Sequence, residues 1–100
     1  MHNLIYKLLK HLFKLMYEIY PANRRVEREL IELLQNRSDI LDKLRRLKEE
    51  PRRALDAHPL HGHLKGKWSC WLGYNLRMIY VIDDANKRIE VEAIGSHKIY

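Results

Sequence analysis

The chain of 100 residues contains one cysteine, Cys70, so an internal disulfide is excluded. A single free thiol suits a reducing compartment, and we expect a cytoplasmic protein. Cys70 lies in an apolar stretch, where a cysteine is typically a small buried hydrophobic residue. We therefore do not expect it to act as a nucleophile.

Long apolar runs are also missing, because the longest ones are short and are broken by lysine. This excludes a membrane-spanning helix. The lysines near the start, with no small-residue cleavage site after them, argue against a secretory signal. The chain shows no internal repeat, low-complexity stretch or linker, and its length suits a single domain.

Acidic residues are in deficit: 13 Asp and Glu stand against 19 Lys and Arg, which gives a formal charge of +6. A composition of 46% hydrophobic and 32% charged residues is that of a globular chain. The basic excess favours a polyanionic partner, which can be RNA, DNA, an acidic lipid surface or an acidic protein.

Residues 1–15 have leucines at helical spacing, with lysines mostly on the other side, and predict an amphipathic basic helix. Three interpretations are open. The apolar stripe packs on the domain or on a second copy, the helix lies on a membrane surface, or the segment is an extension upstream of a natural start at Met16. Residues 16–100 form the main domain.

The first half of that domain predicts a short strand over 16–21 and a helical hairpin. Asn23 is the expected cap of a helix over 24–36, and Ser38 that of a second helix ended by Pro51. The second half predicts strands at 67–72, 76–82 and 88–94. The order β-α-α-β-β-β implies an α+β domain, with the hairpin packed on one face of a four-stranded, mainly antiparallel sheet.

The stretch HPLHGHLKGKW at 58–68 gathers His58, His61 and His63. A metal site there would have an incomplete ligand set, because no further suitable ligand lies close by. Exposed histidines on a Pro/Gly-punctuated loop are the simplest interpretation. A role in contacting or cleaving a polyanion is the alternative, because an imidazole can give or take a proton near neutral pH.

Basic and aromatic residues follow the histidines. Lys65 and Lys67 beside Trp68 and Trp71 have the composition of a surface that holds single-stranded nucleic acid, although one tryptophan is expected in the core. Arg77 lies inside an apolar strand, where its charge must be used or paired, with Glu90 or Glu92 as candidate partners. The alternation does not show which face of that strand is buried.

Three motifs carry a resemblance to a known family: HPL-x-G-x-x-KG before the second strand of the sheet, R-x-I-Y within a later strand, and the ending GSH-x-x-Y. In this order and spacing, residues 16–100 resemble the RelE/ParE superfamily of toxins. They are nearest the RelE and YafQ types, which are messenger-RNA endonucleases. Residues 1–15 have no counterpart in that pattern.

The resemblance implies the toxin of a type II toxin–antitoxin system. Such a toxin cleaves ribosome-bound mRNA by attack of the RNA's own 2′-OH on the adjacent phosphate, without a metal or cofactor. Its implied partners are a cognate antitoxin, mRNA and the ribosome, with a homodimer or a toxin–antitoxin heterotetramer as assemblies. The alternative is a catalytically weak or inactive binder of an antitoxin, RNA or gyrase.

The resemblance and the residue chemistry together assign roles. His58 and His97 are the acid–base candidates, and Arg77 and Lys65 the candidates for phosphate stabilisation. The remaining candidates contact RNA: His61, His63, Lys67, Trp68, Trp71, Asn75, Lys98 and Tyr100. Trp71 stands where YafQ-like enzymes have a histidine, and Asn75 where they have an aspartate, which leaves catalytic competence open.

Overall fold

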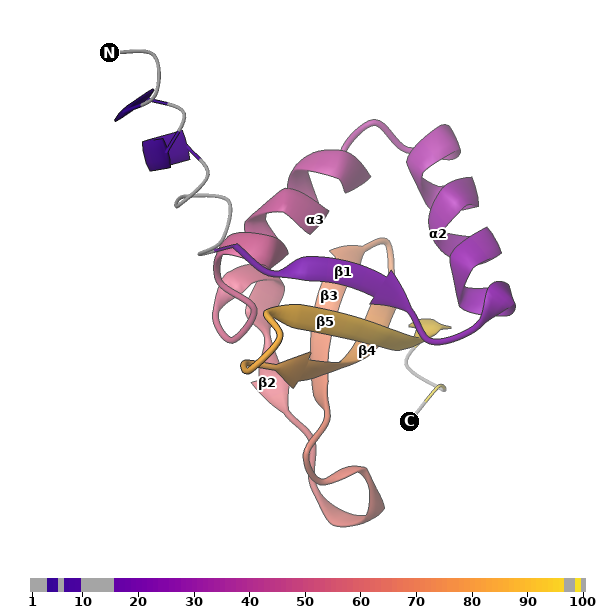
Figure 1. Cartoon of the computed structure of the whole chain (residues 1–100). Helices are drawn as coiled ribbons and strands as arrows, with labels where there is room; N and C mark the ends of the chain where they lie inside the picture. The colour runs from indigo at the N-terminus through magenta and orange to yellow at the C-terminus, as the bar shows by residue number, and fades with distance from the viewer. Residues whose placement is uncertain (1–3, 6, 10–15, 97–98, 100) are drawn as a thin grey trace.

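Two helices cover one face of a five-stranded sheet in the described part of the computed structural model, which comprises residues 4–5, 7–9, 16–96 and 99 (Figure 1). The elements in chain order are β1 (Glu18–Pro21), α2 (Arg24–Asn36), α3 (Ile40–Glu49), η1 (Ala54–Asp56), β2 (His58–Pro59), η2 (Gly62–Leu64), β3 (Trp68–Gly73), β4 (Leu76–Asp83) and β5 (Arg88–Gly95). The sheet order is β1-β5-β4-β3-β2, with β1 parallel to β5 and the other pairs antiparallel. The predicted α+β class and mainly antiparallel sheet are confirmed.

The strand count differs from the prediction by one, because β2 joins the sheet at its edge. His58 pairs with Ser69 and Pro59 with Trp68. The N–H of Leu60 then donates to the carbonyl oxygen of Lys67 at 2.8 Å. A strand of two residues is too short to give an alternating pattern, so the sequence did not reveal it. Its effect is to fix His58 against β3.

Helix α2 begins as predicted, with Asn23 as its N-cap. The Oδ1 atom of Asn23 accepts a hydrogen bond from the N–H of Val26 at 3.0 Å. The predicted cap of the second helix was wrong, because Asp39 and not Ser38 holds the N-cap position of α3. The carboxylate of Asp39 caps no N–H group, since it is turned toward two cations.

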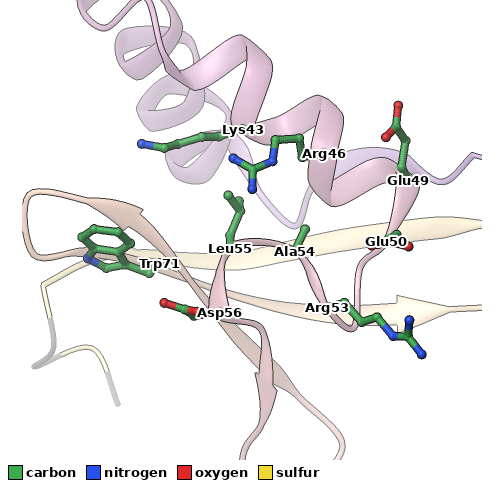
Figure 2. A pocket seen from close by; sticks show the side chains of 9 residues that line it. All are labelled: Lys43, Arg46, Glu49, Glu50, Arg53, Ala54, Leu55, Asp56 and Trp71. Carbon is green, nitrogen blue, oxygen red and sulfur yellow. The ribbon is translucent and has the colours of Figure 1, made fainter.

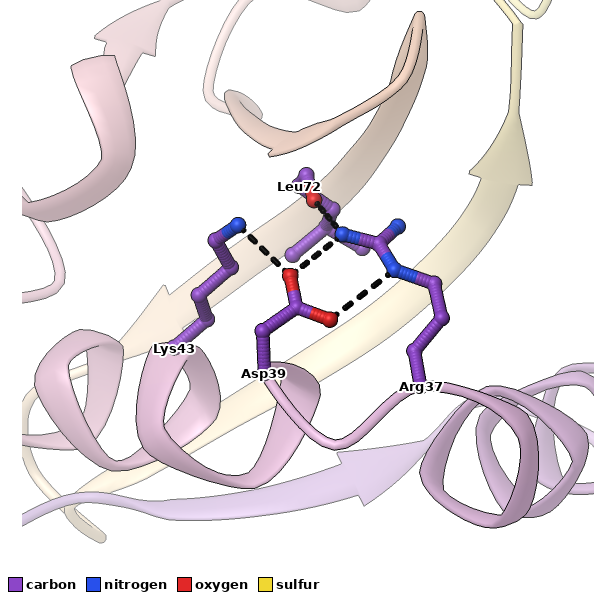
Figure 3. A network of polar contacts seen from close by, with 4 residues as sticks. All are labelled: Arg37, Asp39, Lys43 and Leu72. Carbon is purple, nitrogen blue, oxygen red and sulfur yellow. Dashed lines mark hydrogen bonds and ion pairs between the residues drawn. The ribbon is translucent and has the colours of Figure 1, made fainter.

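These cations are Arg37 and Lys43, and together with Asp39 they form a network between the helices and β3 (Figure 3). The Nη2 atom of Arg37 donates to a carboxylate oxygen of Asp39 at 2.5 Å and to the carbonyl oxygen of Leu72 at 2.6 Å. The Nζ atom of Lys43 donates to Asp39 at 2.8 Å. Hydrogen bonds from the two cations lower the pKa of Asp39. The network therefore ties the connection between α2 and α3 to β3.

The core lies between the helical hairpin and the covered face of the sheet. It comprises Tyr17, Val26, Leu30, Ile40, Leu44, Leu47, Leu55, Cys70, Leu72, Met78, Tyr80, Ile89 and Val91. Each such aliphatic or aromatic side chain contributes about 1.5–3 kcal/mol when it leaves water. The predicted burial of Cys70 is confirmed, and burial raises the pKa of its thiol to about 12. The hydroxyl of Tyr80 donates to the carbonyl oxygen of Pro51 at 2.6 Å, which satisfies it inside the core.

Residues 4–5 and 7–9 are helical, in agreement with an N-terminal helix, and expose Leu4, Ile5, Leu8 and Leu9. The rest of the predicted stripe, at 10–15, lies outside the described residues. Among the helices that the structure describes, none has the length and apolar character needed to cross a membrane.

A polar cluster at the edge of the core joins three segments that are distant in the sequence. The hydroxyl of Tyr17 donates to Oδ1 of Asp84, and Nη2 of Arg52 donates to Oδ2 of Asp84 at 2.8 Å. Tyr17 leads into β1, Arg52 follows α3, and Asp84 lies in the β4–β5 turn. The hydrogen bond from Arg52, followed by that from Tyr17, lowers the pKa of Asp84 from 3.8 to about 2.

Because the pKa of Asp84 is lower in the folded state, its ionised form stabilises the fold above pH 4 and loses this effect as the pH falls toward 2. We expect Asp84→Asn to lower the urea midpoint at pH 7 and to flatten its fall between pH 4 and pH 2. Asp42→Asn is the control, because Asp42 pairs only within α3. Equal acid sensitivity of the wild type and Asp84→Asn would contradict this role.

Candidate functional site

The sheet has a second face, opposite α2 and α3, which we call the open face; it carries His58, Ser69, Trp71, Arg77 and Ile79. His58 and Trp71 are exposed there, Arg77 is half-buried, and Ser69 and Ile79 are buried. Met78 and Tyr80 of β4 are fully buried in the core. Since successive side chains of a strand point to opposite sides, Arg77 and Ile79 point away from the helices. The structure thus resolves the question that the sequence pattern left open.

Strand pairing brings the open-face residues into two rows. Paired residues on antiparallel strands share a face, so His58, Ser69 and Ile79 form one row across β2, β3 and β4. Trp71 pairs with Arg77 in the next row. With strands about 4.8 Å apart and about 3.4 Å per residue, the Cα atoms of His58 and Arg77 are separated by about 12 Å. Two long side chains can converge on one phosphate group across that span.

The imidazole of His58 is oriented by the backbone. Its Nδ1 atom lies 3.1 Å from the carbonyl oxygen of Asp56. A carbonyl oxygen only accepts, so Nδ1 carries the proton in the neutral ring. The Nε2 atom then has a free lone pair on an exposed side chain. This is the arrangement of a general base.

The segment before His58 has an unusual backbone. Leu55 and Asp56 have positive φ angles of 57° and 54°. Such conformations cost about 1–3 kcal/mol each for residues other than glycine, and they persist only where surrounding contacts impose them. Burial of the Leu55 side chain supplies such a contact. The turn aims the Asp56 carbonyl at His58.

Arg77 is half-buried and forms no ion pair within the part of the chain that the structure describes. The predicted alternative of a bridge to Glu92 is wrong, because the carboxylate of Glu92 pairs with the ammonium group of Lys67. Lys67 directly precedes β3 and Glu92 lies on β5, with β4 between these two strands. Since the other face is filled by the core, this ion pair crosses β4 on the open face. The guanidinium of Arg77 is therefore available to an anion.

The other predicted residues are dispersed. His61, His63 and Lys65 are exposed on the β2–β3 loop, which projects beyond the end of the sheet (Figure 1). Trp68 lies on the covered face, partly buried against the core, so it is the less exposed tryptophan of the pair. Asn75 lies in the β3–β4 turn, at the far end of β3 from the loop. His97, Lys98 and Tyr100 lie outside the described residues. Across the described positions, no three His, Cys, Asp or Glu side chains gather as metal ligands.

Sequence reasoning missed two contributors to the open face. Glu92 was read only as a partner for Arg77, because the bulge that changes the β4–β5 register near Ile79 has no sequence signature. The Asp56 carbonyl was missed because a backbone acceptor leaves no residue-type signal. The residue type at position 56 is a weak sequence signal for its positive φ angle, since aspartate adopts the left-handed region more often than most residues do.

Comparisons with known proteins identify the fold. No family model and no curated protein matches the chain. Among solved structures, a chain of the toxin–antitoxin complex RelBE2 from Mycobacterium tuberculosis aligns with a TM-score of 0.64 and 23% identity, over 82% of this chain and 99% of that one. The chain has the RelE/ParE toxin fold.

Two further structures support the RelE-type fold. A chain of the YoeB–YefM complex from Staphylococcus aureus aligns with a TM-score of 0.64 and 18% identity, over 81% of this chain and 97% of that chain. A chain of the archaeal RelE–RelB complex from Pyrococcus horikoshii aligns with a TM-score of 0.62 and 22% identity, over 85% of this chain and 99% of that chain. The chain covers these RelE-type neighbours almost completely.

The register that pairs Trp71 with Arg77 depends on the β3–β4 turn. Gly73 has a φ of +89°, and a Cβ added there would lie 3.1 Å from Nη2 of Arg37. We expect Gly73→Ala to lower the free energy of unfolding by about 1–3 kcal/mol, measured by urea denaturation. Gly66→Ala is the control, with a similar φ of +96° and nothing within 4 Å. Gly66→Ala should lower the free energy of unfolding by less than Gly73→Ala does. Equal decreases in the two variants would show that the contact with Arg37 contributes nothing.

Proposed function

We propose that this protein is the toxin of a type II toxin–antitoxin system and an endoribonuclease that cuts mRNA on the ribosome. The observation that carries the proposal is the open face, where an oriented imidazole and an unpaired guanidinium lie two strands apart beside an exposed tryptophan. The fold is that of proteins whose structures were solved as toxins with their antitoxins.

The open face supplies two of the groups that RNA cleavage needs. The Nε2 atom of His58 takes the proton of a ribose 2′-OH, whose oxygen then forms a bond to the adjacent phosphorus. The bond from phosphorus to the 5′-oxygen breaks, leaving a 2′,3′-cyclic phosphate and a 5′-hydroxyl end. Arg77 stabilises the negative charge that grows on the phosphoryl oxygens. His97 is the candidate donor of the proton to the 5′-oxygen.

The exposed ring of Trp71, 42% accessible beside Arg77, offers a stacking surface to an unpaired base. Stacking on aromatic side chains is the usual way in which single-stranded RNA is held. The tryptophan found in place of a catalytic histidine thus suits base binding. A cognate antitoxin would act by covering the open face, and the formal charge of +6 favours an acidic partner for that purpose.

The test is inducible expression in a bacterial host, with growth followed and 5′ ends of transcripts mapped. Wild type should arrest growth and create new 5′-hydroxyl ends within coding sequences. His58→Ala should reduce cleavage by about 10²–10⁴-fold, as expected for loss of a general base. Arg77→Ala should reduce it by about 10²–10³-fold through loss of charge stabilisation.

Matched controls separate the site from general charge effects. His63→Ala removes an exposed imidazole on the projecting loop, and Arg28→Ala removes an exposed guanidinium on α2. Both should cleave as the wild type does. Wild-type cleavage by His58→Ala and Arg77→Ala would refute the assigned roles. Growth arrest without cut transcripts would favour a binder that acts on another target.

A further inference from the structure

A cavity of about 460 Å³ lies between α3, η1 and the edge of β3 (Figure 2). Its lining comprises Lys43, Arg46, Glu49, Glu50, Arg53, Ala54, Leu55, Asp56 and Trp71. Figure 2 shows Glu49, Glu50 and Arg53 at the end of the cavity away from Trp71. No residue of this cavity other than Trp71 belongs to the open face as defined above. Beyond Ser69, β3 has no β2 partner, so the cavity opens at that edge of the sheet.

Trp71 and Asp56 connect the cavity to the open face. The pairing of Trp71 with Arg77 places it on the open face, and its ring also forms one end of the cavity. The carbonyl oxygen of Asp56 faces His58, while its carboxylate faces the cavity near Trp71 (Figure 2). An RNA strand held at His58 and Arg77 can therefore place a neighbouring nucleotide in the cavity.

The groups at the Trp71 end match the parts of a nucleotide. Figure 2 shows the side chains of Lys43 and Arg46 reaching over this end, above Leu55. Lys43 shares its charge with Asp39 at 2.8 Å, whereas Arg46 is exposed and forms no ion pair among the described residues. Arg46 is thus the stronger phosphate ligand of the two. The Trp71 ring offers a surface on which a base stacks.

The carboxylate of Asp56 adds selectivity. Guanine presents two adjacent donors on one edge, N1–H and the exocyclic amino group, and two carboxylate oxygens can accept both. Adenine presents a single amino group beside a ring acceptor, which a carboxylate repels. Both are purines and stack similarly, so the carboxylate separates them.

We propose that this cavity is a nucleotide subsite that takes a guanine nucleotide next to the cleaved phosphate, with the base stacked on Trp71 and paired with Asp56, and its phosphate bound by Arg46 and Lys43. The inference rests on the proposed function, because it extends the RNA path from the open face.

The test measures binding without cleavage. The probes are 2′-O-methylated pentanucleotides UUGUU and UUAUU, which lack the attacking hydroxyl. In the full-length Trp68→Phe protein, Trp71 is the remaining tryptophan, and its fluorescence should be quenched on binding. UUGUU should bind about tenfold more tightly than UUAUU, as expected for one bidentate base contact. Asp56→Asn, which tolerates the positive φ, should abolish or reverse that preference.

Arg46→Glu should weaken binding of both probes by about tenfold or more, through loss of a phosphate contact and repulsion. Arg45→Glu is the matched control, because it makes the same charge change on a different side of α3, where Arg45 pairs with Asp42 and lines a different groove. It should change binding by less than about twofold at about 0.15 M salt, because the Arg45 side chain does not line the cavity and salt weakens its effect on a phosphate bound there. Circular dichroism confirms that each variant is folded.

Equal effects of Arg46→Glu and Arg45→Glu, or no quenching of Trp71, would overturn the subsite. Binding with no preference for UUGUU would overturn the role of Asp56. The proposed function is judged separately by the cleavage of wild type and His58→Ala. If the wild type cleaves RNA but does not bind the probes as predicted, the nucleotide subsite is refuted and the nuclease function stands. If the probes bind as predicted but the wild type does not cleave RNA, the nuclease function is refuted and the subsite stands.

Discussion

The antiparallel pairing of β3 with β4 is the constraint on which the candidate site depends. Cys70 and Leu72 on one strand and Met78 and Tyr80 on the other are fully buried against the helices. Their burial fixes the register, since a slip of one residue would turn this apolar set toward water. With the register fixed, Trp71 and Arg77 must lie side by side on the open face. The site is thus a consequence of how the core is packed.

Much of the fold was predictable because it depends on local patterns. The apolar stripe over 24–36 and the Asn23 cap define α2 through short-range chemistry. The alternation over 88–94 likewise defines β5. Ser38 was assigned as a cap wrongly because the competing attraction of Arg37 and Lys43 for Asp39 is a tertiary effect. The strand at His58 was not predicted, because it forms only through its pairing with Ser69, which is distant in the sequence.

The candidate site was predictable in its residue types and less so in its geometry. Histidine, arginine and tryptophan were expected near one another, and the strand pairing places His58, Trp71 and Arg77 on one face. His61 and Lys65 were expected there too, but the projecting loop carries them elsewhere. Composition shows that cations are abundant; only the register shows which of them share a surface.

The ion pair between Lys67 and Glu92 has a consequence for how a polyanion would load onto the open face. Elsewhere on the surface, a lysine that meets a phosphate displaces the small counterions that surround the nucleic acid. Lys67 already holds an anion of the protein's own, so a phosphate arriving there exchanges with a tethered carboxylate. The displaced carboxylate of Glu92 would then add local negative charge beside the bound strand. Binding at this point replaces one anion by another. Added salt therefore screens both the Lys67–Glu92 ion pair and the Lys67–phosphate ion pair that replaces it.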